Sequence, residues 1–353
     1  MHRQLSLLTP SGHLTLGNLL GALRPMAATQ HEDCFYGIAD LHAMTTPHDP
    51  ARLRGLVQET ATLMLAAGLD EATLFVQSRV PAHAQLAYLL ECTATTGELN
   101  RMIQFKEKGG RVGPRPSSAP AGVPSCGAPS AGAQQATQPA RPPSGRGVDS
   151  PRVSLFTYPA LMAADILLYR PVQVPVGADQ RQHVELTRDL AVRFNRDYAP
   201  VFTVPEITVP PAGARVMRLD DPTRKMGKSD ADAAGVVLLL DSPDVVRRKV
   251  ARAVTDSDTG PDAVRAAPSK PGVTNLLDVL AACGGSAEGI TTYGALKRVV
   301  TDAVVAVLEP LQRRYAELAE DPAHVMSVFE AGAARCREVT APVLADAQAA
   351  MGL

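Results

Sequence analysis

Two lysines, Lys225 and Lys228, lie three positions apart in the second half of the chain, with Gly227 between them. A glycine in such a segment leaves the backbone free to fold over a bound group. Two ammonium groups on one loop can close on a polyphosphate and offset the negative charge that develops during phosphoryl transfer. A solvated surface loop explains the same residues equally well, so this motif alone does not decide the chemistry.

A second candidate motif lies near the N-terminus, in residues 9–18. Pro10, Ser11 and Gly12 form a predicted tight turn after a short apolar run, and Gly17 and Asn18 follow at the start of a helical pattern. Backbone N–H groups at a helix N-terminus bind phosphate, and a glycine there lets a flat ring approach the main chain. Taken alone, a purely structural turn is the simpler interpretation of these residues.

A single carboxylate, Asp165, lies in an otherwise apolar helical pattern over 161–169. An unpaired carboxylate is costly to bury, so this side chain requires hydrogen-bond donors. The donors could belong to a ligand, which would make Asp165 a specificity residue. They could also belong to a nearby arginine, or to a backbone turn that the carboxylate caps.

Short apolar strands alternate with helices in the first part of the chain, as they do in parallel βαβ units. The pattern predicts strands over 4–8, 34–39, 74–76 and 172–176, and helices over 16–24, 52–67, 83–93, 161–169 and 180–195. Beyond residue 240 the apolar spacing predicts helices over 272–283, 293–308 and 325–351. The predicted fold class is therefore α/β, with a parallel-sheet domain and a mostly helical second domain. The Pro-, Gly- and Ser-rich residues 109–150 predict a disordered insertion.

The composition is that of an ordinary globular protein. The chain has 353 residues, 45% of them hydrophobic and 20% charged, with a formal net charge of -1. This length predicts about two domains. The apolar runs are too short to span a bilayer or to form a signal peptide, so a cytoplasmic location without membrane attachment is expected. The five widely spaced cysteines argue against a disulfide framework and a common zinc site, and no metal ligand is assigned.

Taken together and in this order, the two motifs resemble the signature sequences of class I aminoacyl-tRNA synthetases. Three further segments, 104–108, 158–169 and 174–180, resemble the bacterial tryptophanyl-tRNA synthetase family, as do residues 183–195. The resemblance covers the chain outside 109–150. It implies a Rossmann-type fold and an ATP-dependent reaction in which L-tryptophan forms tryptophanyl-adenylate and then passes to the 3′ end of tRNA(Trp).

The resemblance also implies partners and domains. The enzyme would use Mg²⁺ with ATP and would work as a homodimer. Residues 1–215 would form the Rossmann-type catalytic domain. Residues 216–325 would form the helical anticodon-binding domain. The loop that carries Lys225 and Lys228, called the lysine loop below, would lie at its start. The final helix over 326–353 would pack back on the catalytic domain.

Site residues follow from the same resemblance. Lys225, Lys228 and Lys108 would be the catalytic lysines, of which Lys108 reaches the pyrophosphate. The residues expected to bind ATP are Thr9, Pro10, Ser11, Gly17, Asn18, Gly177, Asp179, Met217, Lys225, Met226, Lys228 and Ser229.

For tryptophan, the indole N–H is only a donor, so Asp165 would be its acceptor. A substrate without that donor would leave the carboxylate unsatisfied. The other residues expected around the tryptophan are Tyr158, Met162, Gln180, His42, Leu5, Val174 and Val176.

Three positions depart from the family pattern, and two alternative functions stay open. Gly227 replaces a serine, Leu5 a common phenylalanine and Thr9 a frequent glutamine. One alternative is a paralogue that senses tryptophan or binds RNA without charging it. The other is a tyrosyl-tRNA synthetase, which shares the fold and both signatures but needs partners for a phenol.

Overall fold

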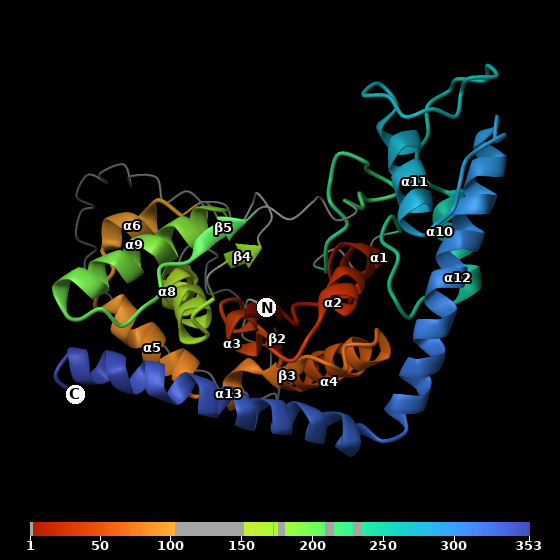
Figure 1. Cartoon of the computed structure of the whole chain (residues 1–353). Coiled ribbons are helices and arrows are strands. Elements are labelled where there is room, and N and C mark those ends of the chain that lie inside the picture. The colour runs from red at the N-terminus through yellow and green to blue at the C-terminus, as the bar shows by residue number, and fades with distance from the viewer. Residues whose placement is uncertain (1–2, 103–151, 172, 176–180, 209–214, 229–233) are drawn as a thin grey trace, which may run out of the picture.

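The computed structural model describes residues 3–102, 152–171, 173–175, 181–208, 215–228 and 234–353. The segment 109–150, which the sequence predicts to be a disordered insertion, lies outside these residues. Figure 1 shows the described chain as a group of helices and strands on one side and an upright group of helices on the other, with one long helix running beneath.

Three parallel strands form the central sheet, β1 (Gln4–Leu8), β2 (Cys34–Ile38) and β3 (Thr73–Val76), with β2 in the middle. A second parallel pair consists of β4 (Gln173–Pro175) and β5 (Glu206–Thr208). The register places Gly37 between Leu7 and Phe75. A Cβ atom at Gly37 would lie 2.4 Å from Leu7 Cδ2, so a glycine is required where the neighbouring side chains cover the middle strand. The parallel pairing confirms the predicted α/β fold class.

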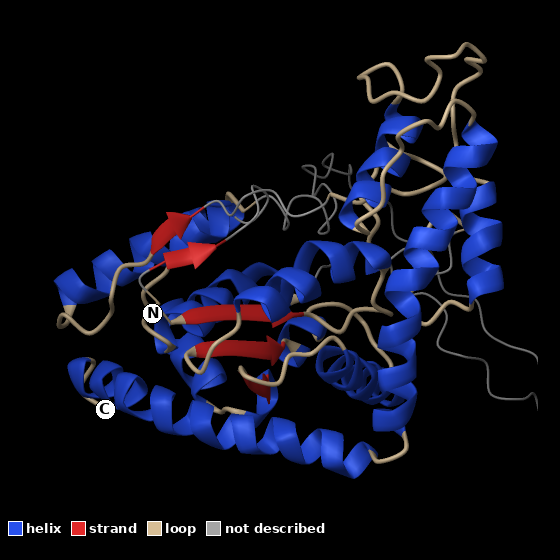
Figure 2. Ribbon diagram, turned by 45° about the vertical axis from the view of Figure 1, so that its right-hand side comes forward, coloured by secondary structure: helices blue, strands red, loops and turns tan. Residues whose placement is uncertain are grey.

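Helices connect the strands and cover the sheet (Figure 2). Before residue 102 they are α1 (Leu16–Asn18), a π-helical stretch η1 (Leu19–Leu23), α2 (Arg24–Thr29), α3 (Asp40–Ala43), α4 (Pro50–Ala66), the 3-10 turn η2 (Gln77–Arg79), α5 (Ala82–Glu91) and α6 (Thr96–Asn100). After residue 152 follow α8 (Val153–Leu168) and α9 (Arg181–Asp197). Two of them, α5 and α8, pack on each other.

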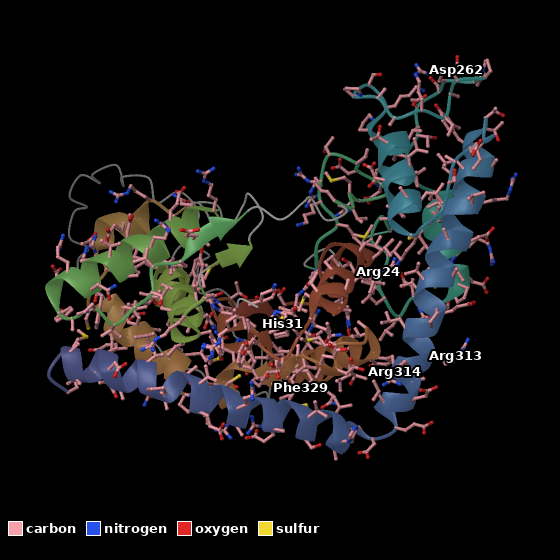
Figure 3. The ribbon with its side chains drawn as sticks, viewed as in Figure 1. Arg24, His31, Asp262, Arg313, Arg314 and Phe329 are labelled. Atoms are coloured by element: carbon pink, nitrogen blue, oxygen red, sulfur yellow. The ribbon has the colours of Figure 1, made fainter. Side chains whose placement is uncertain are left out.

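The C-terminal part consists of α10 (Pro243–Ala251), α11 (Pro271–Ala282), α12 (Tyr293–Ala319) and α13 (Pro322–Ala350). Helix α12 packs against α10 and α11, while α13 turns back and runs along β3, α4 and α5. Asp262 lies at the outer end of this helical group, and Phe329 lies on the part of α13 beneath the sheet (Figure 3). Arg24 of α2 joins the two groups, because its Nη1 donates to the carbonyl of Ala282, 3.1 Å away.

Two large apolar clusters and one small one form the core of the described residues. One large cluster joins the strands and α4 to α10, α11 and α12, and it includes Val216, Val236 and Val237. The other large cluster lies between α5, α8, α9 and the second half of α13. The first cluster therefore continues through the position at which the sequence predicts a domain boundary, and the division at residue 216 stays a prediction.

Candidate active site

The lysine loop is held in a short antiparallel arrangement. Met217 and Lys225 form a β-bridge, and the N–H of Met226 donates to the carbonyl of Val216 at 3.0 Å. The side chain of Met226 is buried, whereas that of Lys225 is exposed. The loop is thus anchored through its methionine while the first lysine faces solvent.

Asn275 of α11 supports this loop through two hydrogen bonds to Met217. Its Oδ1 accepts a hydrogen bond from the N–H of Met217 at 2.9 Å, and its Nδ2 donates to the carbonyl of Met217 at 3.1 Å. Asn275 is itself buried. An amide that pairs with both backbone groups of one residue fixes the start of the loop to the helical part of the chain.

Lys228 reaches the N-terminal motif. Its Nζ donates to the carbonyl of Thr9 at 2.9 Å. A Cβ atom at Gly12 would lie 2.5 Å from the carbonyl oxygen of Lys228, and one at Gly17 would lie 3.3 Å from that of Met226. The two glycines therefore let the backbone of the lysine loop come against the N-terminal turn, and the structure brings the two motifs together.

The N-terminal turn is held by its own hydrogen bonds. Asn18 Oδ1 accepts from the backbone N–H of Thr15 at 3.0 Å and from its hydroxyl at 3.1 Å. The N–H of Leu16 donates to Val237 at 2.8 Å, which ties the helix start to the segment after the lysine loop. In the same turn Pro10 is buried and Ser11 exposed. Asn18 Oδ1 is engaged in the turn, and the hydrogen bonds of the described residues give its amide nitrogen no partner.

Burial changes the acidity of the second lysine. It lowers the pKa of the Lys228 ammonium to about 8, because removing a cation from water disfavours the charged form. The only partner that the hydrogen bonds of the described residues give this ammonium is the neutral carbonyl of Thr9. An ammonium in these surroundings is stabilised by an anion that comes close to it.

Asp165 is surrounded by three hydrogen-bond donors. Gln77 Nε2 and His83 Nδ1 lie 2.7 and 2.6 Å from its Oδ1, and His42 Nε2 lies 2.7 Å from its Oδ2. Its partners are two imidazoles and an amide, rather than the arginine or backbone turn considered from the sequence. Burial alone would raise the pKa of Asp165, but the hydrogen bonds from His42 and His83 lower it to about 2. Asp165 is therefore a buried carboxylate at neutral pH.

Several residues predicted around the tryptophan gather near this carboxylate. The ring centroids of His42 and Tyr158 lie 6.3 Å apart, and the Tyr158 hydroxyl lies 2.5 Å from His183 Nε2. Burial raises the pKa of Tyr158 to about 12. Leu5 and Met162 pack together against one small apolar cluster, formed by Ile166 and Val184.

The other predicted residues lie outside the described structure. Val174 belongs to β4, but its side chain is not described. The predicted residues in the undescribed segments are Lys108, Val176, Gly177, Asp179, Gln180 and Ser229. Their roles stay predictions.

Sequence reasoning missed part of the site. Gln77 and His83 are fully buried and donate to Asp165, and Asn275 anchors the lysine loop. One signal was available for Gln77, since it directly follows the strand β3, where parallel sheets place functional residues. His83 and Asn275 lie within helical patterns and have no comparable signal.

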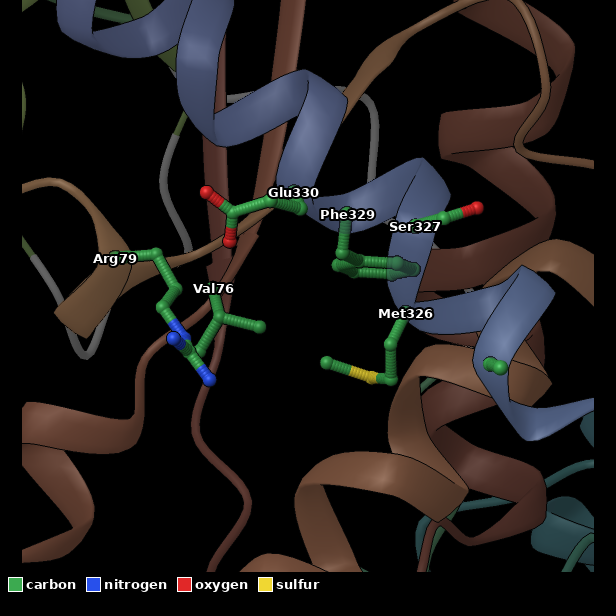
Figure 4. A pocket seen from close by; sticks show the side chains of 7 residues that line it. Val76, Arg79, Met326, Ser327, Phe329 and Glu330 are labelled. Carbon is green, nitrogen blue, oxygen red and sulfur yellow. The ribbon is translucent and has the colours of Figure 1, made fainter.

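A small cavity lies apart from these residues, between β3 and η2 on one side and α13 on the other (Figure 4). Its volume is about 270 Å³, and Val76, Arg79, Met326, Phe329 and Glu330 are among its lining residues. The lining contains none of the residues predicted to bind ATP or tryptophan.

The described residues contain neither a membrane-spanning helix nor a cluster of metal ligands. Among the helices of these ranges, none has the length and apolar composition needed to cross a bilayer. Within the same ranges there is no group of three or more His, Cys, Asp or Glu side chains that could hold a metal ion.

Comparisons with known proteins agree with this geometry. The sequence model of a family described as tRNA synthetases class I (W and Y) matches residues 3–119 and 140–313. The chain is 50% identical to tryptophan–tRNA ligase 1 of Streptomyces avermitilis, covering 100% of this chain and 99% of the relative. It is 41% identical to the tryptophan–tRNA ligase of Caldanaerobacter subterraneus, covering 100% and 99%.

Two solved structures of tryptophanyl-tRNA synthetases are similar to this chain over nearly its whole length. The tryptophanyl-tRNA synthetase of Mycoplasma pneumoniae aligns with a TM-score of 0.80 and 33% identity, covering 100% of this chain and 98% of that one. The enzyme from Campylobacter jejuni, in complex with ADP and tryptophan, aligns with a TM-score of 0.75 and 28% identity, covering 99% and 100%.

Proposed function

The chain belongs to the class I tRNA synthetases of the tryptophan and tyrosine group, and from this premise we propose that it is a tryptophan–tRNA ligase. It activates L-tryptophan with ATP and transfers the tryptophanyl group to the 3′ end of tRNA(Trp). The curated relatives with 41–50% identity over the whole chain are ligases for tryptophan, which favours tryptophan over tyrosine. Because these relatives are named as ligases, they also disfavour a paralogue that does not charge tRNA.

One observation carries the proposal: Lys228 donates to the carbonyl of Thr9 while two glycines of the N-terminal motif receive the backbone of the lysine loop. Two segments far apart in sequence, each suited to phosphate, thus form one site. The ammonium of Lys228 can exchange a neutral carbonyl for a phosphate oxygen, which is a stronger, charge-assisted contact.

The proposed reaction needs no covalent nucleophile from the protein. In the first step the tryptophan carboxylate attacks the α-phosphorus of ATP, and pyrophosphate leaves. Lys225 and Lys228 stabilise the negative charge on the phosphates, an electrostatic role that is worth most in a site with little water. In the second step a ribose hydroxyl of the terminal tRNA adenosine attacks the acyl carbon, and AMP leaves.

The carboxylate of Asp165 supports the choice of tryptophan, because it can accept one more hydrogen bond than its donors in the described structure provide. A carboxylate offers about four lone-pair positions, two on each oxygen. Among the described residues, Gln77 and His83 donate to Oδ1, whereas His42 alone donates to Oδ2. One acceptor position on Oδ2 is left, beside a histidine that keeps 14% of its side-chain surface exposed. We assign this position to the indole N–H.

Mg²⁺ belongs to the proposal as part of the nucleotide substrate. Divalent cations neutralise ATP phosphates and are commonly held by the phosphates together with few protein groups. The predicted contacts of ATP with Gly177, Asp179 and Ser229, and of tryptophan with Gln180, belong to the same proposal.

The deciding experiment measures exchange of labelled pyrophosphate into ATP with each of the twenty amino acids in turn. We expect rapid exchange with tryptophan alone, followed by charging of tRNA(Trp) in a second assay. Exchange driven by tyrosine would replace tryptophan as the substrate. Tight tryptophan binding without any exchange would instead establish the non-charging paralogue.

The assembly and the domain roles complete the proposal. We propose a cytoplasmic homodimer in which residues 216–325 contact the tRNA anticodon and the last helix packs on the catalytic domain. Light scattering at several concentrations tests the dimer, and a mass of 37.2 kDa, that of one chain, would contradict it.

A further inference from the structure

A buried chain of hydrogen bonds continues behind Asp165, in the direction away from His42. His83 Nδ1 lies 2.6 Å from Asp165 Oδ1, and His83 Nε2 lies 3.0 Å from the hydroxyl of Tyr169. His83 and Tyr169 are both fully buried, and Asp165 is 1% exposed. Neither His83 nor Tyr169 has a role in the proposed reaction.

The chemistry of the partners determines the protons in this chain. The ionised Asp165 only accepts, so His83 Nδ1 must carry a hydrogen. In the neutral imidazole the other nitrogen is then an acceptor, and the hydroxyl of Tyr169 donates to it. The Tyr169 hydroxyl thereby selects the tautomer of His83 that can donate to the carboxylate.

Two aromatic rings pack against the imidazole and hold it in its plane. Phe75 stacks on His83 with ring centroids 5.8 Å apart and an interplanar angle of 21°. The ring of Tyr169 lies 5.6 Å from that of His83 and 5.8 Å from that of Phe75. With its ring packed and both nitrogens bonded, His83 has one orientation available.

The far end of the chain is covered by α13. A Cβ atom at Gly332 would lie 1.8 Å from the carbonyl oxygen of Leu74, so this helix packs directly on the backbone of β3. One turn later the buried Cys336 interacts with the side chain of Tyr169. The C-terminal helix therefore seals the hydrogen-bond chain from water.

We propose that His83 and Tyr169 are positioning residues that fix Asp165 for recognition of an N–H-bearing side chain, under the cover of α13. The inference rests on the proposed function, in which Asp165 accepts the indole N–H. Two donors on Oδ1, from Gln77 and His83, prevent the carboxylate from rotating and leave the open position of Oδ2 at one place. Without the Tyr169 hydroxyl, His83 Nε2 is a buried acceptor without that donor, and the tautomer that donates to Asp165 is less favoured.

The test compares two substrates in the pyrophosphate exchange assay, L-tryptophan and L-3-benzothienylalanine, in which sulfur replaces the indole N–H. For Tyr169→Phe we expect kcat/KM for tryptophan to fall about tenfold, through KM, because a buried acceptor loses its donor. The kcat/KM for benzothienylalanine and the KM for ATP should not change. An equal loss with both amino acids would show a purely structural role and would overturn the proposal.

Tyr36→Phe is the matched control. Tyr36 is also a buried tyrosine of the sheet region, and its hydroxyl donates to the carbonyl of Met26 at 3.5 Å. This hydroxyl lies outside the chain behind Asp165, so its removal should leave the ratio of the two substrates unchanged. A similar fall of the ratio in Tyr36→Phe would also argue against a specific role for Tyr169.

A second pair of variants tests His83 itself. Asparagine can place an amide N–H near the position of Nδ1, so His83→Asn should keep most of the preference for tryptophan, whereas His83→Leu should lose it. Equal substrate ratios in the two folded variants would contradict the proposal. Failure of the proposed function is distinguishable, because the wild type would then show no preference for tryptophan over benzothienylalanine.

Discussion

The lysine–glycine contact and the Asp165 network are two parts of one proposed site, but they are built in different ways. The first joins backbone to backbone, with Gly12 under Lys228 and with Lys225 exposed to solvent. The second consists of buried side chains whose donors and acceptors are matched. The part of the site that faces phosphate can therefore adjust around its ligand, whereas the part that selects the amino acid is fixed before the ligand arrives.

The largest expected effect concerns the charge of the lysine loop. Lys228→Ala should lower the rate of tryptophan-dependent pyrophosphate exchange by about 10²–10³-fold, the usual cost of removing one preorganised electrostatic contact. The KM for tryptophan should change little. Lys297→Ala is the control, because Lys297 also donates to a backbone carbonyl, that of Ala251, at 3.1 Å. Equal rates in the two variants would remove Lys228 from the mechanism.

Asp165→Ala should lower stability as well as remove the preference for tryptophan, in contrast to the lysine variant. It leaves the buried donors of Gln77 and His83 without an acceptor, so we expect the free energy of unfolding to fall by about 3–5 kcal/mol in urea titrations at pH 7. The exposed Asp346, which pairs with Arg170 at 3.0 Å, is the control and should change little when replaced by alanine. Equal stability of Asp165→Ala and the wild type would mean that the network is not formed.

Protonation of Asp165 at low pH should lower the stability of the folded protein. The pKa of Asp165 is lowered to about 2 in the folded protein, below its ordinary value of about 3.9. Its contribution to stability is therefore complete above about pH 4 and is lost as the pH falls through 2.

Gly12→Ala tests the backbone contact between the N-terminal turn and the lysine loop. The added methyl would lie 2.5 Å from the carbonyl oxygen of Lys228, so the loop must move away and the KM for ATP should rise about tenfold. Gly17→Ala should act less strongly, because its contact is 3.3 Å. Gly55 in α4 has open space around it and serves as the control. A larger effect at Gly55 than at Gly12 would contradict the packing argument.

The smallest expected effect is a pH dependence of the lysine part alone. Burial lowers the pKa of Lys228 to about 8, so its charge is complete below this pH and is lost as the pH rises through it. We expect the exchange rate to fall by a few-fold between about pH 7.5 and 9, since the neutral amine no longer stabilises phosphate charge. Lys228→Arg stays charged and should show no such decline. The same decline in both proteins would assign it to another group.

With rising pH, the contribution of Lys228 to stability changes in the opposite direction to its contribution to the exchange rate. Its folded pKa of about 8 lies below its ordinary value of about 10.4. The unfolded chain therefore binds more protons between these two values, and the cost of burying the ammonium disappears as the pH rises through this window.

The alternation of strands and helices, the two phosphate motifs and the buried carboxylate can be predicted from the amino-acid sequence alone. These features depend on local patterns: apolar spacing, glycine in a turn, and one acid in an apolar helix. The predicted strand 4–8 and the helix from residue 293 begin where the structure places them, although the latter continues to Ala319.

Which of these groups contact each other depends on the tertiary structure. The contact of Lys228 with Thr9 spans 219 positions, and that of Asp165 with His42 spans 123. Such pairings depend on how the sheet and α13 pack, and a single sequence carries no local signal for them. The donors of Asp165 come from three separate elements, because each one alone cannot neutralise a buried carboxylate and only the assembled core holds them within hydrogen-bond distance.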